Sequence, residues 1–307
     1  MILYLLRRII SFLLRYSPSD KFSDILLWPV SKRLFGHGYT EIVTISNGLK
    51  MKVYGDMEDM VNKLIMFTSQ YVPLAWEPGT ARLVEKLSVR SRCVVVAGSH
   101  IGYYPLIIGH TNHNAEIYAF EPNPLNRERC KENIALNKLN NVRVYDEALG
   151  DVIGVKKMYF DFGQSSFINS GRSHAGDGVV KINTLDKFFE QNTNKPDLII
   201  LDAEGYESKI LEGGKEIISQ NHPTIIFEMN LSALNGSETS PDAITQFLLE
   251  RGYTLFVIDE GTHGLNFNKQ ISIKLVPYAN YDIKKMSFVN VLAIIDTNTI
   301  QEYVNTI

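Results

Sequence analysis

A glycine turn after a short apolar run constrains the fold of this 307-residue chain more than any other feature. The run from Val94 to Ala97 contains β-branched and small residues, which suit a strand buried on both faces. Gly98 and Gly102 follow it, and glycine permits both a sharp backbone turn and the close approach of a ligand. A helix is predicted from about Ile101 to Gly109. This strand, turn and helix predict a Rossmann-like α/β fold that holds a nucleoside cofactor.

An acidic residue supports this interpretation. The segment from Glu116 to Phe120 predicts a second strand, and Glu121 follows it, 19 residues after Gly102. Rossmann-like folds place a carboxylate at about this spacing, where it accepts hydrogen bonds from both ribose hydroxyls. The glycine pair alone also fits a plain strand-to-helix turn, so the preference for a cofactor site depends on Glu121.

A series of further blocks follows in a characteristic order. The blocks are Glu121-Pro122-Asn123, Asn133 to Asn137, Glu147 to Asp151, Thr184-Leu185-Asp186, Pro196 to Glu207, Leu211 to Gly214 and Pro223 to Asn230. In this order and spacing they resemble the FkbM family of S-adenosylmethionine-dependent methyltransferases, over about residues 92 to 258. The resemblance implies a class I methyltransferase fold: a mostly parallel seven-stranded sheet with helices on both faces. It also implies methylation of a hydroxyl on a sugar, glycolipid or related metabolite.

The resemblance also implies roles for individual residues. Gly98 and Gly102 are expected near the methionine end of S-adenosylmethionine, Glu121 at its ribose, and Asp146 and Glu147 near its adenine. Asp202 and Glu204, after the fourth strand, are expected to face the methyl-transfer centre.

Two positions depart from the family pattern. Where the family usually has Asp two residues before the first glycine, this chain has Val96, and where it usually has Asn two residues after that glycine, it has His100. The missing Asp normally anchors the amino-acid end of the cofactor. His100 is a candidate to replace it as a donor to the cofactor carboxylate, or a turn histidine satisfied by local backbone.

Carboxylates are the leading candidates for chemistry. A protonated hydroxyl is a poor nucleophile, so a group that accepts its proton assists the transfer, and Asp202 and Glu204 are predicted to be catalytic. Extended geometry would send both side chains to one face. The alternative for Glu204 is a carboxylate at a helix N-terminus. Glu228, near the end of the fifth predicted strand, is a weaker candidate for binding the acceptor.

A long segment rich in Gly and Ser runs from Asp161 to Gly178 without helical or strand periodicity. A loop of this length in a compact domain is commonly functional or disordered, and its position favours a lid over the acceptor. The candidate acceptor-binding side chains in it are Ser165, Ser166, Arg172 and His174. Each is equally consistent with a solvated loop residue.

Composition narrows the function classes. Lys and Arg total 31 against 34 Asp and Glu, a net charge of −3, which argues against a nucleic-acid partner. The two cysteines, Cys93 and Cys130, have the spacing of neither a zinc site nor a disulfide framework, which favours a reducing, cytoplasmic compartment. His110 and His113 have no third ligand nearby in the sequence, so no metal site is predicted.

The chain divides into three predicted parts. Residues 1–80 form an N-terminal appendage with an amphipathic helix, a hairpin that turns at Asn47-Gly48 and a helix near Glu58 to Thr68. Residues 81–296 form the methyltransferase domain, with an irregular insertion from Gly261 to Tyr281, and 297–307 form a tail. The oligomeric state stays open.

The first helix is predicted to be amphipathic. Arg7, Arg8, Ser11 and Arg15 share one narrow sector of it, and the rest is apolar. The arginines interrupt a run too short to span a bilayer. One interpretation is a helix peripheral on a membrane, with its cations towards lipid headgroups. The other is a helix packed on its own domain or against another subunit.

Two other function classes remain open. A ribose carboxylate also serves nicotinamide cofactors, although the turn lacks a third glycine. Because Val96 replaces the usual Asp, the chain is alternatively a methyltransferase-like protein that binds a partner without turnover.

Overall fold

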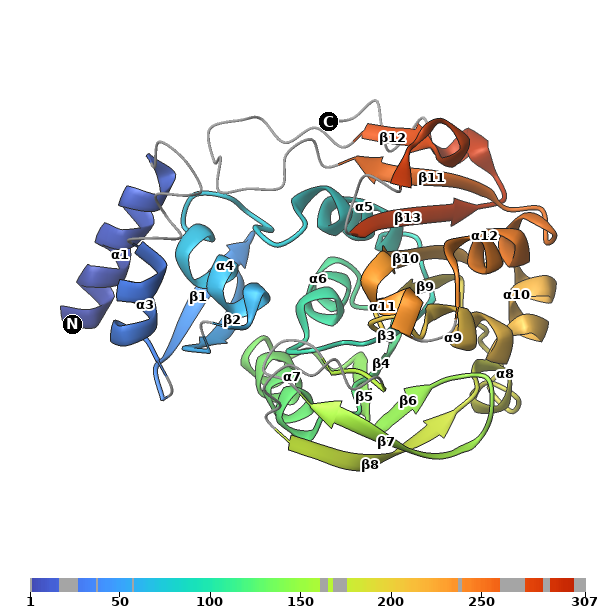
Figure 1. Ribbon diagram of the computed structural model, residues 1–307, viewed down its shortest axis with the longest axis horizontal. Coiled ribbons are helices and arrows are strands. Elements are labelled where there is room, and N and C mark those ends of the chain that lie inside the picture. The colour runs from blue at the N-terminus through green and yellow to red at the C-terminus, as the bar shows by residue number, and fades with distance from the viewer. Residues whose placement is uncertain are drawn as a thin grey trace.

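A central sheet with helices on both faces organises the protein (Figure 1). The computed structural model describes residues 2–16, 27–36, 38–56, 58–160, 165–167, 176–236, 239–259, 274–283 and 288–300. The described strands form an eight-stranded sheet of order β12-β11-β13-β10-β9-β3-β4-β5. The predicted Rossmann-like α/β architecture is confirmed.

The strands of this sheet are mostly parallel. Five neighbours run in one direction: β5 (Val142–Tyr145), β4 (Glu116–Phe120), β3 (Cys93–Ala97), β9 (Leu198–Leu201) and β10 (Thr224–Asn230). The remaining three pair antiparallel with their neighbours: β13 (Phe288–Ile294), β11 (Thr254–Asp259) and β12 (Lys274–Pro277). The sequence predicted seven strands, and the eighth, β12, lies within the insertion that was predicted to be irregular.

Alternate residues of the buried strands face two different hydrophobic cores. In β3, Val94 and Val96 pack on one side, and Val95 and Ala97 on the other. The first side is covered by α5 (Pro78–Ser88), α6 (Tyr103–Thr111) and α7 (Pro124–Leu136). The second is covered by α8 (Leu185–Phe188), α9 (Glu207–Gly213), α10 (Lys215–Asn221), α11 (Leu231–Gly236) and α12 (Pro241–Leu249). Because both faces are covered, the apolar run in β3 is explained by burial.

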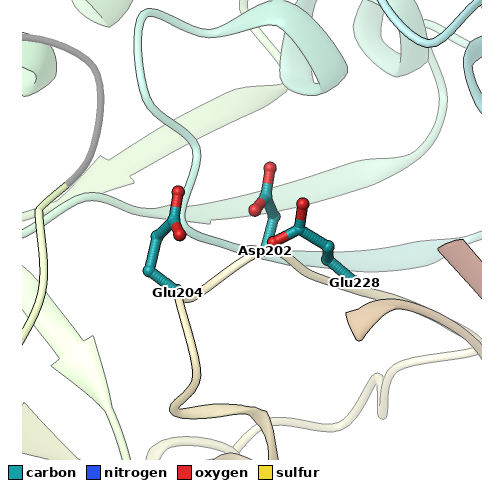
Figure 2. Close-up of side chains that lie close together, drawn as sticks. All are labelled: Asp202, Glu204 and Glu228. Carbon is teal, nitrogen blue, oxygen red and sulfur yellow. The ribbon is translucent and has the colours of Figure 1, made fainter. Parts of the chain in front are cut away.

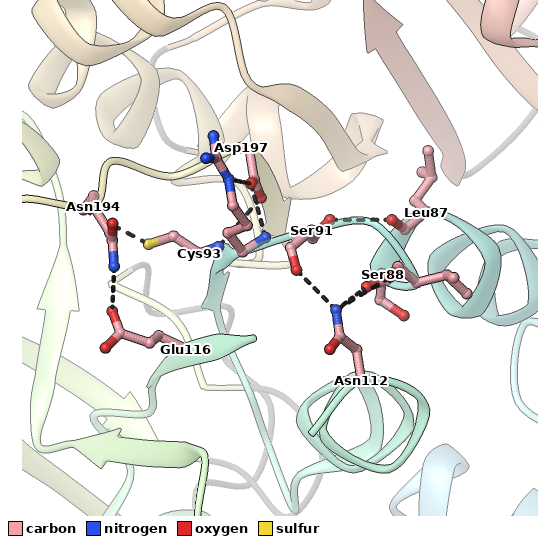
Figure 3. Close-up of polar contacts among 10 residues, drawn as sticks. Leu87, Ser88, Ser91, Cys93, Asn112, Glu116, Asn194 and Asp197 are labelled. Carbon is pink, nitrogen blue, oxygen red and sulfur yellow. Dashed lines mark hydrogen bonds and ion pairs between the residues drawn. The ribbon is translucent and has the colours of Figure 1, made fainter. Parts of the chain in front are cut away.

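Side chains fix the amino ends of the parallel strands. Asp197, just before β9, accepts hydrogen bonds from the backbone N–H groups of Arg92 (2.8 Å) and Cys93 (3.4 Å) at the start of β3 (Figure 3). Asn112, after α6, donates to the carbonyl groups of Ser88 (2.9 Å) and Ser91 (2.8 Å). These contacts hold the strands in register at the end of the sheet opposite the candidate site.

A second, three-stranded sheet of order β6-β8-β7 lies beside the first, formed by β6 (Glu147–Leu149), β7 (Gly154–Phe160) and β8 (Gly176–Asn183). This sheet was not predicted from the sequence. β8 begins at Gly176, inside the segment predicted to be a loop. The glycines at its start obscured the alternating pattern that identifies a strand. Residues 161–164 and 168–175, which include Arg172 and His174, lie outside the described residues.

The N-terminal part contains the predicted hairpin. β1 (Thr40–Ser46) and β2 (Leu49–Tyr54) are antiparallel, and the turn residues Asn47 (φ 26°) and Gly48 (φ 82°) both have positive φ. This is the backbone that an Asn-Gly hairpin turn requires. α4 (Met60–Thr68) follows the hairpin. Short 3₁₀ helices, η2 (Tyr278–Asn280) and η4 (Thr297–Thr299), lie near the C-terminal strands.

The hairpin is attached to α7 by side-chain amides. Asn133 bonds both backbone groups of Lys52: its Oδ1 accepts from N–H (2.7 Å) and its Nδ2 donates to the carbonyl (3.2 Å). Asn137 bonds Lys50 in the same way, at 2.9 and 2.6 Å. The N-terminal part is therefore joined directly to the sheet-and-helix unit.

The first helix, α1 (Ile2–Arg15), lies at the edge of the protein beside α3 (Trp28–Leu34) (Figure 1). Its inward face carries Arg7 and Ser11 from the polar sector together with the apolar Ile10 and Leu14, whereas Arg8 is exposed. α1 therefore packs on the protein, as one of the two interpretations of the sequence expected. Arg7 is 4% exposed, its Nε lies 2.7 Å from Glu41 Oε2, and its guanidinium donates to the Met66 carbonyl at 2.8 Å. Ser11 is buried too. The sequence pattern located the polar residues of the helix but not Glu41 on β1, the acid that pairs with Arg7.

Most apolar side chains of α1 face outward, although Ile10 and Leu14 are buried. The exposed apolar side chains are Ile2, Leu3, Tyr4, Leu5, Ile9, Phe12 and Leu13. None of the described helices is both long enough and apolar enough to cross a membrane.

Candidate functional site

The glycine turn follows β3 at the carboxyl edge of the sheet. Gly98 has φ +82°, and the N–H groups of Gly98 and Ser99 both donate to the Phe120 carbonyl at 3.1 Å. A Cβ on Gly98 would lie 1.8 Å from the carbonyl oxygen of Asp202. Glycine is required here because the turn touches the chain after β9. The turn therefore sets the position of Asp202.

Gly102 serves a different contact. It precedes α6 with φ +98°, and a Cβ there would lie 3.0 Å from the sulfur of Cys130 on α7. The second glycine therefore allows α6 and α7 to approach closely. The predicted turn between β3 and the following helix is confirmed, and both glycines are explained by protein contacts.

Glu121 joins two turns at the carboxyl end of β4. Its side chain is buried; Oε2 accepts from the His100 N–H (2.7 Å) and Oε1 from the Asn123 N–H (2.9 Å). Burial raises the pKa of Glu121 to about 7, although the His100 charge and the two N–H groups oppose the shift. Each carboxylate oxygen has more than one lone pair, so these bonds leave capacity for ligand hydroxyls.

His100 pairs with an acid from the N-terminal part. Its backbone has positive φ (49°), and its Nε2 lies 3.2 Å from Oδ2 of Asp59. Asp59 is fully buried and caps α4 by accepting from the Asn62 N–H at 3.1 Å. Burial alone would lower the pKa of His100, but the Asp59 carboxylate outweighs it and the pKa is raised. The protonated imidazolium is thereby favoured at the turn.

This pairing was not predicted. From the sequence, His100 was expected to contact the cofactor or local backbone, and Asp59 had no predicted role. An Asp directly before a helix is an N-cap signal, which would have located Asp59 but not its partner. Val96, at the position of the family's usual Asp, is fully buried in the core. The acidic group near the turn is therefore contributed by α4 instead of β3.

Three carboxylates converge at the carboxyl ends of β9 and β10: two follow β9, and Glu228 lies within β10 (Figure 2). Ligand oxygens of Asp202, Glu204 and Glu228 all lie within 4.8 Å of one another. The backbone N–H of Asp202 donates to the Ala97 carbonyl at 2.9 Å, which fixes this residue beside the glycine turn. The predicted proximity of Asp202 and Glu204 is confirmed.

The reason for that proximity differs from the predicted one. β9 ends at Leu201, and Glu204 has φ 51°, so the chain is not extended through this segment. A turn, and not strand alternation, brings the two acids together. α9 begins at Glu207, so Glu204 is not in the first turn of that helix.

Two acids of this cluster, Asp202 and Glu228, have raised pKa values. Burial raises the pKa of Asp202 to about 6, and the His100 charge opposes the shift. Burial also raises the pKa of Glu228 well above its usual value, and the neighbouring Asp202 and Glu204 add to this shift. Oε2 of Glu228 is buried and has no hydrogen-bond partner among the residues that the structure describes. Ionising all three acids would therefore place like charges close together, which a bound cation would offset.

Glu207 supports the turn that carries these acids. It is 1% exposed, and its Oε1 accepts from the N–H groups of Ala203 (2.8 Å) and Gly205 (3.4 Å). Burial raises its pKa to about 7. The residue belongs to the block that ends with Gly-Tyr-Glu, but the pattern alone did not indicate that it holds the backbone around Glu204.

The other predicted binding residues lie near β5 and the second sheet. Asp146 is exposed after β5, and Glu147 starts β6 and accepts from Asn183 Nδ2 at 3.0 Å. Ser165 Oγ accepts from Asn123 Nδ2 at 2.8 Å, which joins its segment to the Glu121 turn. Ser166 makes reciprocal backbone hydrogen bonds with Tyr159 on β7. Their predicted ligand contacts stay predictions.

The sequence around the site matches a known protein family. The model of the methyltransferase FkbM domain matches residues 97–255, from the last residue of β3 into β11. The chain belongs to the FkbM methyltransferase domain family. All three carboxylates and the glycine turn lie within the matched segment.

One curated protein is similar to part of this FkbM-family chain. The 2-O-methyltransferase NoeI of Sinorhizobium fredii is 28% identical over 124 residues, which are 34% of this chain and 50% of NoeI. The chain thus matches about half the length of that curated relative.

Two solved structures are also similar. A methyltransferase FkbM from Methylobacillus flagellatus has a TM-score of 0.41 and 15% identity over 66% of this chain and 43% of its own. The O-methyltransferase TomG from Streptomyces achromogenes has a TM-score of 0.43 and 14% identity over 72% of this chain and 82% of its own. Family membership rests on the sequence match and not on these scores.

Proposed function

We propose that this protein is an S-adenosylmethionine-dependent O-methyltransferase whose acceptor is a hydroxyl of a sugar, a glycolipid or a related metabolite. The main observation is the carboxylate cluster at the carboxyl ends of β9 and β10, next to the glycine turn that ends β3. In open α/β sheets, ligands bind at this edge. Membership of the family and the 2-O-methyltransferase activity in the name of NoeI support the reaction class.

The residues around the turn fit the cofactor. Glu121 is buried at the end of β4 with lone pairs left for ribose hydroxyls. Nδ1 of His100 is buried and has no hydrogen-bond partner among the described residues, so it is available to the carboxylate of the cofactor's amino-acid end. The raised pKa of His100 favours the positive charge that such a contact needs. This arrangement offers a substitute for the acid missing at Val96.

S-adenosylmethionine supplies a methyl group on a positively charged sulfur. The protein has to hold the acceptor oxygen in line with that bond, and such positioning contributes on the order of 7 to 11 kcal/mol in favourable cases. Asp202 would accept the hydroxyl proton as the new C–O bond forms, and its pKa of about 6 suits a base near neutral pH. Glu204 and Glu228 would orient the acceptor, with Ser165, Ser166, Arg172 and His174 as further candidate contacts.

The experiment that tests this proposal is calorimetric titration of the purified protein with S-adenosylmethionine, followed by transfer of a labelled methyl group to sugar-bearing lipids. We expect saturable binding and label in the acceptor. Binding without transfer to any hydroxyl-bearing acceptor would favour the non-catalytic alternative. Absence of heat and of thermal stabilisation at millimolar cofactor would contradict the cofactor assignment itself.

Glu121→Gln should weaken cofactor binding by about 1.5 to 3 kcal/mol, because the hydroxyls lose a charged acceptor. The dissociation constant for S-adenosylmethionine should therefore rise at least tenfold in titration calorimetry. Glu116→Gln is a matched control, since Glu116 begins the same strand at the opposite edge of the sheet. Equal affinities for Glu121→Gln and wild type, with both folded, would remove Glu121 from the ribose site.

We further propose that α1 places the protein on an anionic membrane surface, with its exposed apolar side chains inserted into the interface. Ile2, Leu5 and Phe12 are more than half exposed, at 74%, 60% and 54%. Basic residues Arg8, Lys32 and Arg33 are exposed on α1 and the adjacent α3, and the described part of α1 contains no acid. Apolar insertion next to cations is typical of interfacial helices. A glycolipid acceptor would be reached from such a surface.

Leu5→Glu combined with Phe12→Glu should abolish co-sedimentation with phosphatidylglycerol vesicles. Burial of each large apolar side chain contributes about 1.5 to 3 kcal/mol, so the pair should reduce partitioning by about 10²-fold or more. The control is Val155→Glu with Val179→Glu, at 69% and 73% exposed positions of the second sheet. Sedimentation unaffected by the α1 substitutions, or absent in the wild type, would leave α1 as a helix that only packs on its own domain.

A further inference from the structure

We propose that Asp202, Glu204 and Glu228 bind one divalent metal ion, Mg²⁺ or Mn²⁺, next to the acceptor hydroxyl. The sequence did not predict this metal site, because Glu228 meets Asp202 and Glu204 only through the pairing of β10 with β9. The binding of the ion is independent of the reaction, whereas its catalytic role rests on the proposed methyl transfer.

The first observation is geometric. One oxygen from each of the three carboxylates lies within 4.8 Å of the others, and the three side chains point towards a common region (Figure 2). Asp202 and Glu204 come from the turn after β9, and Glu228 comes from β10, which pairs with β9. Two neighbouring strands therefore hold the oxygens in a fixed relation, which suits an ion that requires defined coordination.

The second observation is the state of Glu228. Its Oε2 is buried and lacks a hydrogen-bond partner among the described residues. A carboxylate oxygen that is buried without a partner is costly. The charges that act most strongly on Glu228 all belong to acids: Asp202, Glu204, Glu77 and Glu207. His100 is the nearby cation that acts on Asp202, but its ring already lies against Asp59. A metal ion in the cluster would supply the missing positive charge.

The ligand set indicates which ion fits. Three carboxylate oxygens without nitrogen or sulfur favour hard cations such as Mg²⁺ and Mn²⁺. Three protein ligands leave positions open in an octahedral ion for water or for acceptor oxygens. Two adjacent hydroxyls of a sugar would occupy such positions, so the substrate class predicted here is a vicinal diol.

The ion would assist the transfer by lowering the pKa of the acceptor hydroxyl. The hydroxyl proton passes to the oxygen of Asp202 that does not face the ion. The acceptor oxygen then forms a bond to the methyl carbon while the bond from that carbon to sulfur breaks, which leaves a methyl ether and a neutral thioether. No oxidant or reductant is needed.

Titration of the full chain with Mn²⁺, without cofactor or acceptor, tests the site by the electron paramagnetic resonance signal of free Mn²⁺. We expect one saturable site. Glu228→Gln and Glu204→Gln should each raise the dissociation constant at least tenfold. Glu212→Gln should leave it unchanged, because Glu212 is exposed on α9 and pairs with Lys215. Circular dichroism would confirm that each variant is folded.

Two results would overturn the site: no saturable binding up to about 1 mM Mn²⁺, the weak end of protein cation sites, or equal affinity in the wild type and both cluster variants. The first result would mean that the acids share a proton instead of an ion. Failure of this inference is distinguishable from failure of the proposed function. Methyl transfer that persists in excess EDTA would contradict the catalytic role of the ion and leave the proposed methyltransferase activity standing. Mn²⁺ binding without any methyl transfer would support the metal site and contradict the proposed activity.

Discussion

Asp202→Asn should reduce turnover by about 10²-fold or more while S-adenosylmethionine binding changes little, because the amide keeps the shape of the side chain but cannot accept the hydroxyl proton. Steady-state kinetics and titration calorimetry on the same preparation would measure both quantities. The matched control is Asp151→Asn, since Asp151 is an acid that pairs with Lys209 away from the cluster. Wild-type turnover in Asp202→Asn would mean that Asp202 has a structural role only.

The pH dependence provides a second measurement of the same role. A base acts in its ionised form, and the pKa of Asp202 is raised to about 6. Turnover of the wild type should therefore fall as the pH drops through about 6, and a cation bound at Asp202 would move this fall to lower pH, because it favours the ionised carboxylate. In Asp202→Asn this acid limb should disappear from what activity remains. If turnover of the variant still falls over the same pH range, the ionisation responsible belongs to another group.

Gly98→Ala should destabilise the protein by about 3 kcal/mol, because a positive φ costs an alanine about 1 to 2 kcal/mol and forced overpacking costs about 1 to 3 kcal/mol more. The added Cβ would lie 1.8 Å from the Asp202 carbonyl oxygen, so the turn and the segment after β9 would have to separate. Urea unfolding followed by circular dichroism would measure the loss. Activity should fall as well, since Asp202 would move.

Gly154→Ala is the control for that substitution. A Cβ on Gly154, at the start of β7, meets no atom within 4 Å. Its free energy of unfolding should remain within about 0.5 kcal/mol of the wild type. A Gly98→Ala variant that unfolds at the wild-type urea concentration would show that the turn is adaptable, and that Gly98 is not needed for backbone contact.

Short-range patterns predicted much of the fold correctly. The buried strand β3, the hairpin at Asn47-Gly48 and the acid after β4 all follow from signals within a few residues, such as β-branched runs and turn dipeptides. The family resemblance added the positions of Asp202 and Glu204, which come together in the structure.

The contacts that the sequence did not predict join segments that are far apart in the chain. The partner of His100 is Asp59 on another element, and the partner of Arg7 is Glu41, so local periodicity placed these basic residues without showing what they face. The same limit applies to Glu228, whose nearness to Asp202 depends on the pairing of β9 with β10. Amphipathicity identified the polar and apolar residues of α1, but not that its packed face combines Arg7 and Ser11 with Ile10 and Leu14.

The asparagine contacts between α7 and the hairpin also bear on how the protein avoids self-association. A strand at the edge of a small sheet offers unpaired backbone groups to any other chain. Asn133 and Asn137 are one helical turn apart, about 6 Å along the axis, which nearly matches the rise of about 6.7 Å between alternate strand residues. Their amides therefore occupy the N–H and carbonyl groups of Lys52 and Lys50 as a neighbouring strand would. The helix closes that edge of β2 to intermolecular strand pairing, and aggregation by this route would first require α7 to detach.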